Sequence, residues 1–197
     1  ADIVKLAEGD DRVQWTKQMV DGIAAAVQTG NFTAGVGRLK ATEAEVRKTG
    51  NKNLSAYVAY RRMLAEYTQD LQAAKDAQRQ EVQDQWLKDL ESFAREWPDA
   101  EDAPEAMLQL AIALEFGGKV VDSRKWYDVL ASKYGKTTQG ARASGAARRL
   151  DLKGKPFQLA GTGLRGGKID SRDLRGKVVL VLYWARWCKP CTGDLQQ

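Results

Sequence analysis

Apolar side chains recur at intervals of three and four residues along most of the first 150 positions, which is the spacing of one face of an α-helix. Two amphipathic helices are expected near the N-terminus, over about residues 12–29 and 33–48, because each apolar stripe ends at a turn that contains Gly. Between Asn53 and Trp97 there is neither Gly nor Pro. This stretch predicts one long helix over about 53–97, or two helices in tandem with a bend in the polar residues 75–80.

Shorter helices are expected over residues 104–150, starting from Pro104 at a favourable first-turn position. Small and aromatic residues in this segment fall where a tetratricopeptide-type hairpin needs them, at Ala111, the Gly117-Gly118 turn, Ser123, Tyr127 and Leu130. The segment therefore resembles one such repeat followed by the first helix of another. Repeats of this type imply peptide or protein binding in a concave groove. The alternative interpretation is that they serve only to pack helices against each other.

The pattern changes after Leu150, because six Gly residues and Pro156 fall within residues 154–176. Phe157 and Leu159 alternate as a short strand, and residues 168–169 can pair back on it after a turn. The continuous aliphatic run over residues 177–183 predicts a strand that is buried on both faces. We therefore expect a mainly α protein with a helical domain over residues 1–152 and a second domain over residues 153–197.

Composition narrows the possible chemistry. Of 197 residues, 43% are apolar, which is enough for a packed core, and none is His. The absence of His excludes Ser-His-Asp and Cys-His catalysis, as well as His-ligated zinc. The longest apolar run, residues 178–185, is far shorter than the ~20 residues that span a bilayer. No transmembrane helix is expected.

Charge is distributed unevenly along the chain. The net charge is +5, but residues 1–100 carry 14 basic and 16 acidic side chains, whereas residues 101–197 carry 17 and 10. The basic excess is concentrated between Lys133 and Lys189 and could attract nucleic acid or an anionic membrane surface. Aromatic residues are not interleaved with these charges as a single-strand stacking surface requires. We therefore expect a solvated basic surface and no nucleic-acid partner.

The two Cys residues, Cys188 and Cys191, are separated by two positions. If Cys191 lies in the first turn of a helix, the sulfurs come within disulfide reach, and the unpaired N–H groups of that turn favour a thiolate on Cys188. Cys188 would then be the nucleophile and Cys191 the resolving thiol. Lys189 adds a positive charge beside the thiolate, and Pro190 suits the first helical turn.

Two other roles for this pair compete with redox activity. A zinc site needs four ligands, whereas the chain offers two Cys and no His, so we expect no metal and no cofactor. A purely structural disulfide over so short a loop would restrain the unfolded chain very little. Redox activity is the favoured interpretation.

Residues 154–191, GKPFQLAGTGLRGGKIDSRDLRGKVVLVLYWARWCKPC, resemble the start of a thioredoxin-like domain of the TlpA/ResA or redoxin type. The residues on the motif positions of that family are Trp184, Ala185, Trp187, Cys188, Pro190 and Cys191. The resemblance implies thiol–disulfide exchange with a protein that carries a disulfide or a dithiol. It also implies a bacterial cell-envelope or periplasmic location and permits membrane association of the parent protein, while the residues themselves are also compatible with the cytoplasm.

Two departures from the family pattern stand out. Leu182 occupies the position, six residues before Cys188, where thioredoxins carry a buried acid. The strands, helices and cis-proline loop that should follow the active-site helix cannot be built from residues 192–197, so we expect an incomplete thioredoxin-like domain with little activity of its own. The alternative is a helical-repeat protein-binding module with no catalysis. The residues do not indicate the redox partner, the direction of exchange or the oligomeric state.

Overall fold

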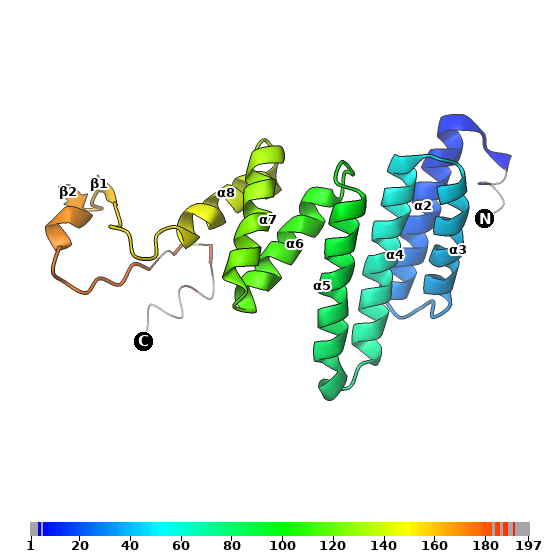
Figure 1. The fold of residues 1–197 in the computed structure, drawn as a ribbon, viewed down its shortest axis with the longest axis horizontal. Coiled ribbons are helices and arrows are strands. Elements are labelled where there is room, and N and C mark those ends of the chain that lie inside the picture. The colour runs from blue at the N-terminus through cyan, green and yellow to red at the C-terminus, as the bar shows by residue number, and fades with distance from the viewer. Residues whose placement is uncertain (1–3, 5, 183, 186, 189–190, 192–197) are drawn as a thin grey trace. The chain divides into compact units, whose positions relative to one another are not determined.

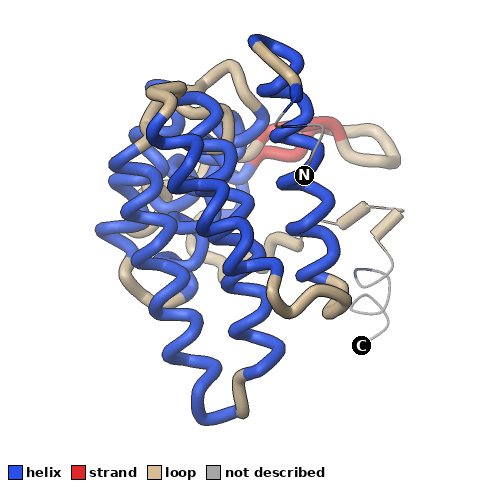
Figure 2. The backbone as a smooth tube through the Cα atoms, turned by 90° about the vertical axis from the view of Figure 1, so that its right-hand side faces the viewer, coloured by secondary structure: helices blue, strands red, loops and turns tan. Residues whose placement is uncertain are grey.

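A computed structural model of the chain describes residue 4 and residues 6–182, 184–185, 187–188 and 191. The chain divides into two compact units, Ala1–Leu150 and Asp151–Gln197. Helices build the first unit, and the second carries a short β-hairpin (Figure 1 and Figure 2). The prediction of a mainly α fold class is confirmed.

The helices of the first unit are α2 (Gly9–Gln28), α3 (Gly35–Lys48), α4 (Lys52–Ala73), the 3₁₀ turn η1 (Asp76–Gln78), α5 (Arg79–Glu96), α6 (Ala103–Phe116), α7 (Val120–Lys133) and α8 (Thr138–Leu150). The predicted helices at both ends of this unit are confirmed to within a few residues. Among the described residues, none of the helices is long and apolar enough to cross a membrane.

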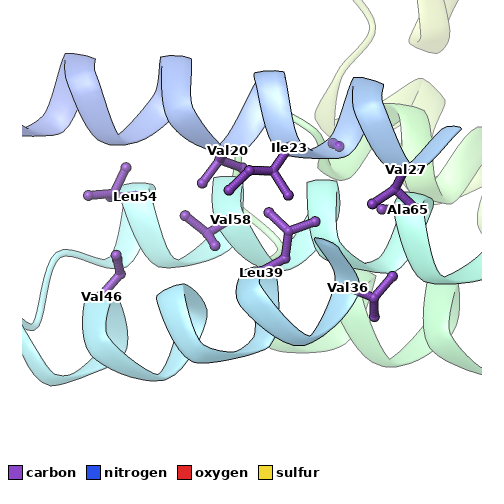
Figure 3. Close-up of a cluster of buried hydrophobic side chains, with 10 residues drawn as sticks. Val20, Ile23, Val27, Val36, Leu39, Val46, Leu54, Val58 and Ala65 are labelled. Atoms are coloured by element: carbon purple, nitrogen blue, oxygen red, sulfur yellow. The ribbon is translucent and has the colours of Figure 1, made fainter. Parts of the chain in front are cut away.

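The first three helices share one core. Val20 from α2, Leu39 from α3 and Val58 from α4 are fully buried and converge from the three helices (Figure 3). Each such side chain contributes about 1.5–3 kcal/mol by leaving water. The start of α4 is fixed by Asn51, whose side chain accepts a hydrogen bond from the Leu54 N–H at 3.0 Å.

Residues 53–97 form two helices, so the prediction of one long helix is wrong and the tandem alternative is confirmed. The break falls in the predicted polar stretch, where Ala74 and Lys75 have extended backbones before η1. Helices α4 and α5 then run side by side in opposite directions (Figure 1). Tyr67 and Trp86 stack with ring centroids 4.6 Å apart. A continuous helix would expose both apolar stripes, whereas the hairpin buries them against each other.

Helices α6 and α7 cross closely at small side chains. Ser123 is fully buried and donates a hydrogen bond to the carbonyl oxygen of Ala111 at 2.8 Å. Tyr127 and Leu130 are also buried, and the Tyr127 hydroxyl donates to Glu115 at 3.0 Å. These contacts explain why small and aromatic residues alternate here, while the tetratricopeptide-type assignment remains a prediction.

The second unit contains an antiparallel hairpin of β1 (Ala160–Thr162) and β2 (Lys168–Asp170), followed by the 3₁₀ turn η2 (Ser171–Leu174). Gly166 and Gly167, both with positive φ, make the turn between the strands. The predicted first strand at Phe157 and Leu159 is wrong in position, because both residues precede β1. Their backbones are instead tied to the Ser171 hydroxyl, which donates to the Phe157 carbonyl and accepts from the Leu159 N–H.

Residues 177–182 form no strand, so the predicted buried strand over 177–183 is wrong for these residues, and Tyr183 lies outside the described part of the chain. The segment is exposed, with 93% of the Leu180 surface accessible. A strand needs a neighbour that satisfies its N–H and C=O groups, and the described residues place none beside this segment.

Candidate functional site

The two Cys residues form a disulfide bond. The Cα atoms of Cys188 and Cys191 are 5.3 Å apart, within the range that a disulfide requires. Both residues are half-buried, so the bond is partly accessible from solvent. The structure therefore brings together the two thiols that the sequence analysis singled out.

The backbone around the disulfide directs an N–H group at one sulfur. Cys191 is helical, and its N–H donates a hydrogen bond to Sγ of Cys188 at 3.3 Å. The Cys188 N–H in turn donates to the Ala185 carbonyl oxygen at 2.9 Å, which fixes the turn. A donor at the start of a helix favours negative charge on the atom it faces. This arrangement would stabilise a thiolate on Cys188 after reduction.

Two tryptophans shortly precede the disulfide in the chain. Trp187 is 86% exposed and Trp184 is also exposed. An indole in water next to a reactive bond offers a partner protein both an apolar surface and an N–H donor. Lys189 and Pro190 lie outside the described residues, so the roles expected of them remain predictions.

The chain that leads to the disulfide is apolar. Val178, Leu180 and Leu182 are all exposed, and Leu182 is the residue that stands where thioredoxins carry an acid. A proton from Cys191 would therefore pass to water or to another group. Among the described residues, no group of three or more Cys, Asp or Glu side chains is arranged to hold a metal ion.

The helical unit contains a groove that the sequence analysis did not single out, between α3, α4 and α5. One signal was present, because Glu81, Gln85 and Asp89 follow one another at intervals of four and share a helix face. The opposite wall of the groove lies on α4, and its position relative to α5 is set by how these two helices pack. The periodicity of the sequence does not predict that packing.

Comparison with known proteins finds similarity over a short stretch. Thirty-four residues of this chain are 47% identical to proteins named "Thiol-disulfide oxidoreductase ResA" in Bacillus thuringiensis (strain Al Hakam) and Bacillus anthracis. A protein of the same name in Bacillus thuringiensis subsp. konkukian is 44% identical over the same length. The match covers 17% of this chain, and the chain spans about a fifth of the length of these relatives.

No family model matches the chain, and no solved structure matches it. The similarity therefore supports a relation to thiol–disulfide oxidoreductases for a short stretch only.

Proposed function

We propose that this chain carries the dithiol of a thiol–disulfide oxidoreductase, with Cys188 as the nucleophile and Cys191 as the resolving thiol. The observation that carries the proposal is the Cys191 N–H, which donates to Sγ of Cys188 across the disulfide at 3.3 Å. The short similarity to proteins named thiol-disulfide oxidoreductase supports the same chemistry.

The reaction consists of two thiol–disulfide exchanges. In the first, the Cys188 thiolate attacks one sulfur of a substrate disulfide, forms a mixed disulfide and releases the other substrate sulfur as a thiolate. In the second, Cys191, after losing its proton to water, attacks Sγ of Cys188 and releases the second substrate thiolate. The substrate gains two electrons, and the chain ends with the Cys188–Cys191 disulfide. An external dithiol must reduce this bond before the next cycle.

The residues around the dithiol have supporting roles. Trp187 offers an exposed surface for the substrate protein. By the sequence pattern, Lys189 would add a positive charge that favours the Cys188 thiolate, and Pro190 would suit a first helical turn. The partner is a protein with a disulfide or a dithiol, and the bacterial cell envelope is the proposed location.

We expect little catalytic turnover from the 197-residue sequence alone. Residues 177–182, which lead to the dithiol, are exposed and have no strand beside them among the described residues. The described residues therefore provide no rigid element that holds the dithiol against a substrate. Reduction of a disulfide-bonded protein such as insulin by dithiothreitol should be accelerated much less than by an intact thioredoxin, and equal acceleration would contradict this expectation.

The assignment of nucleophile and resolving thiol can be tested with two single-cysteine variants. Cys191→Ser keeps the backbone N–H that faces Cys188, whereas Cys188→Ser leaves only Cys191. At pH 7 the thiol of Cys191→Ser should form a mixed disulfide with oxidised glutathione about tenfold faster than that of Cys188→Ser, because a lowered thiol pKa raises the thiolate fraction. Mass spectrometry of the quenched samples measures both rates.

The matched variants differ only in which thiol remains, so equal rates would mean that position 188 is not activated. That outcome would favour a structural disulfide. Circular dichroism of both variants, which should be the same as that of the unaltered chain, shows whether either has lost its fold.

A second candidate function belongs to the helical unit, which we propose as a protein-binding module. The observation that favours it is the groove between α3, α4 and α5, which none of the described residues fills. This function needs no thiol, so Cys188→Ser should leave it intact while abolishing thiol exchange.

A further inference from the structure

The groove of the helical unit has about 710 Å³ of free volume, within the size range of ligand pockets. Helix α3 contributes Lys40, α4 contributes Glu66, Tyr67 and Asp70, and α5 contributes Trp86 and Asp89 among others. On α4 the lining extends from Arg62 to Ala73, about 16 Å at 1.5 Å per residue. This length accommodates about five residues of an extended peptide.

The cations in the groove are already paired. Lys40 lies 2.5 Å from Glu66, and Arg62 lies 2.8 Å from the other oxygen of Glu66 and 2.9 Å from Glu43. By contrast, the lining carboxylates of Asp70, Glu81 and Asp89 form no salt bridge among the described residues. The groove therefore presents an excess of negative charge that its own cations do not neutralise.

The surroundings of Asp70 show the effect of this excess. Partial burial raises the pKa of Asp70, and the neighbouring carboxylates of Glu66 and Asp89 add to the rise, while Lys40 opposes it. A carboxylate in these surroundings gains from a cation supplied by a ligand. The same excess charge disfavours nucleic acid, whose phosphates are also negative.

The groove also has an apolar wall. Tyr67 and Trp86 stack at 4.6 Å with an interplanar angle of 17°, and the Tyr67 hydroxyl donates to Gln83 at 2.7 Å, which fixes the ring. A wall of this kind next to carboxylates suits side chains that combine a methylene stem with a charged end, as Lys and Arg do.

We propose that this groove binds an extended segment of a partner protein that carries Lys or Arg, with their stems along the half-buried Tyr67, which is backed by the buried Trp86, and their charges against Asp70 and Asp89. The inference names the partner chemistry of the binding-module function and rests on it, but it does not depend on the redox chemistry of Cys188. Charge complementarity and the elongated form of the groove favour a peptide over a compact ligand.

The test uses the full oxidised chain and a fluorescein-labelled octapeptide of alternating Lys and Ala with blocked ends, followed by fluorescence anisotropy. Asp89→Asn and Asp70→Asn should each weaken binding by about threefold, as expected for one partly exposed charge pair. A peptide with Glu in place of Lys should not bind. Cys188→Ser should bind as the unaltered chain does, which separates this inference from the redox proposal.

A matched control is available on the same helix. Asp84 accepts a hydrogen bond from Gln80, just as Asp89 accepts one from Gln85, but Asp84 does not line the groove. Asp84→Asn removes the same charge and should leave binding unchanged. Equal weakening by Asp84→Asn and Asp89→Asn, or no binding of the Lys peptide, would overturn the proposal. Tighter binding of spermidine than of the peptide would replace the peptide by a small polyamine and would also overturn it.

Discussion

Gly140 and Gly145 both lie in α8, but their surroundings differ. A Cβ atom at position 140 would overlap the carbonyl oxygen of Tyr134, which is backbone and cannot move aside, whereas a Cβ at position 145 would meet open space. Gly140 is buried against the turn that precedes the helix, and its N–H is bonded to the Thr137 hydroxyl. One glycine is therefore required by packing and the other is not.

We expect Gly140→Ala to lower the free energy of unfolding by about 1–3 kcal/mol, the usual cost of forcing an atom into a packed site. Gly145→Ala should raise it by about 0.5–1 kcal/mol, because Ala is the better helix former. Urea unfolding followed by circular dichroism measures both. A stabilising Gly140→Ala would mean that α7 and α8 approach each other less closely than described.

Single residues also show what the sequence could predict. Ser123 and Tyr127 were placed correctly inside the helical hairpin, because their spacing relative to the Gly117-Gly118 turn is local information. The role of Gly140 was not predicted, since its neighbour Tyr134 approaches through the turn geometry. Cys188 and Cys191 were predicted to come within disulfide reach if Cys191 lies in a helical turn, and they are bonded.

At the scale of elements, Glu115 ties three helices together. It lies on α6, accepts from the Tyr127 hydroxyl of α7 at 3.0 Å and pairs with Arg149 of α8 at 2.6 Å. Burial, together with the hydrogen bond to Glu115, raises the pKa of Tyr127 from 10.0 to about 12. The folded protein therefore holds the phenolic proton more tightly than the unfolded chain does.

This pKa shift predicts a pH dependence of stability. The contribution of Tyr127 is fully present below pH 10, where both states are protonated, and is lost as the pH rises through about 12. Tyr127→Phe should cost about 1 kcal/mol at pH 8 through the lost hydrogen bond. The stability difference between the two proteins should shrink at pH 11. A difference that stays constant from pH 8 to pH 11 would show that the phenol titrates normally.

Two of the elements that the sequence did not predict correctly depend on neighbours. The periodicity of residues 53–97 is the same in one helix and in two, and only the packing of Tyr67 on Trp86 favours the hairpin. The aliphatic run at 177–182 has strong strand preference, yet it forms no strand among the described residues because no partner lies beside it. Local preference sets what a segment can form, and pairing decides whether it does.

At the scale of the whole molecule, the core described for the first unit consists of that unit's own side chains. Its three clusters of buried apolar residues all lie within residues 13–150. A chain of residues 1–150 should therefore melt within about 2 °C of the full chain, a shift that corresponds to less than about 1 kcal/mol. Thermal circular dichroism at 222 nm tests this. A decrease of more than about 10 °C would mean that residues 151–197 contribute to the stability of the helical unit.

The three clusters also share helices. Val58 of α4 belongs to the first cluster, while Tyr60, two positions along, belongs to the second. Helix α5 joins the second cluster to the third in the same way, through Leu90 and Ala94. The unit thus has no single centre, and each part is held by its immediate neighbours, as in repeat proteins. Unfolding of α2 and α3 would expose one face of α4 to solvent while the other face stays packed on α5. Unfolding would therefore advance in steps from a terminus. A peptide bound between α3 and α5 would contact both sides of α4 and so oppose the separation of the first two steps.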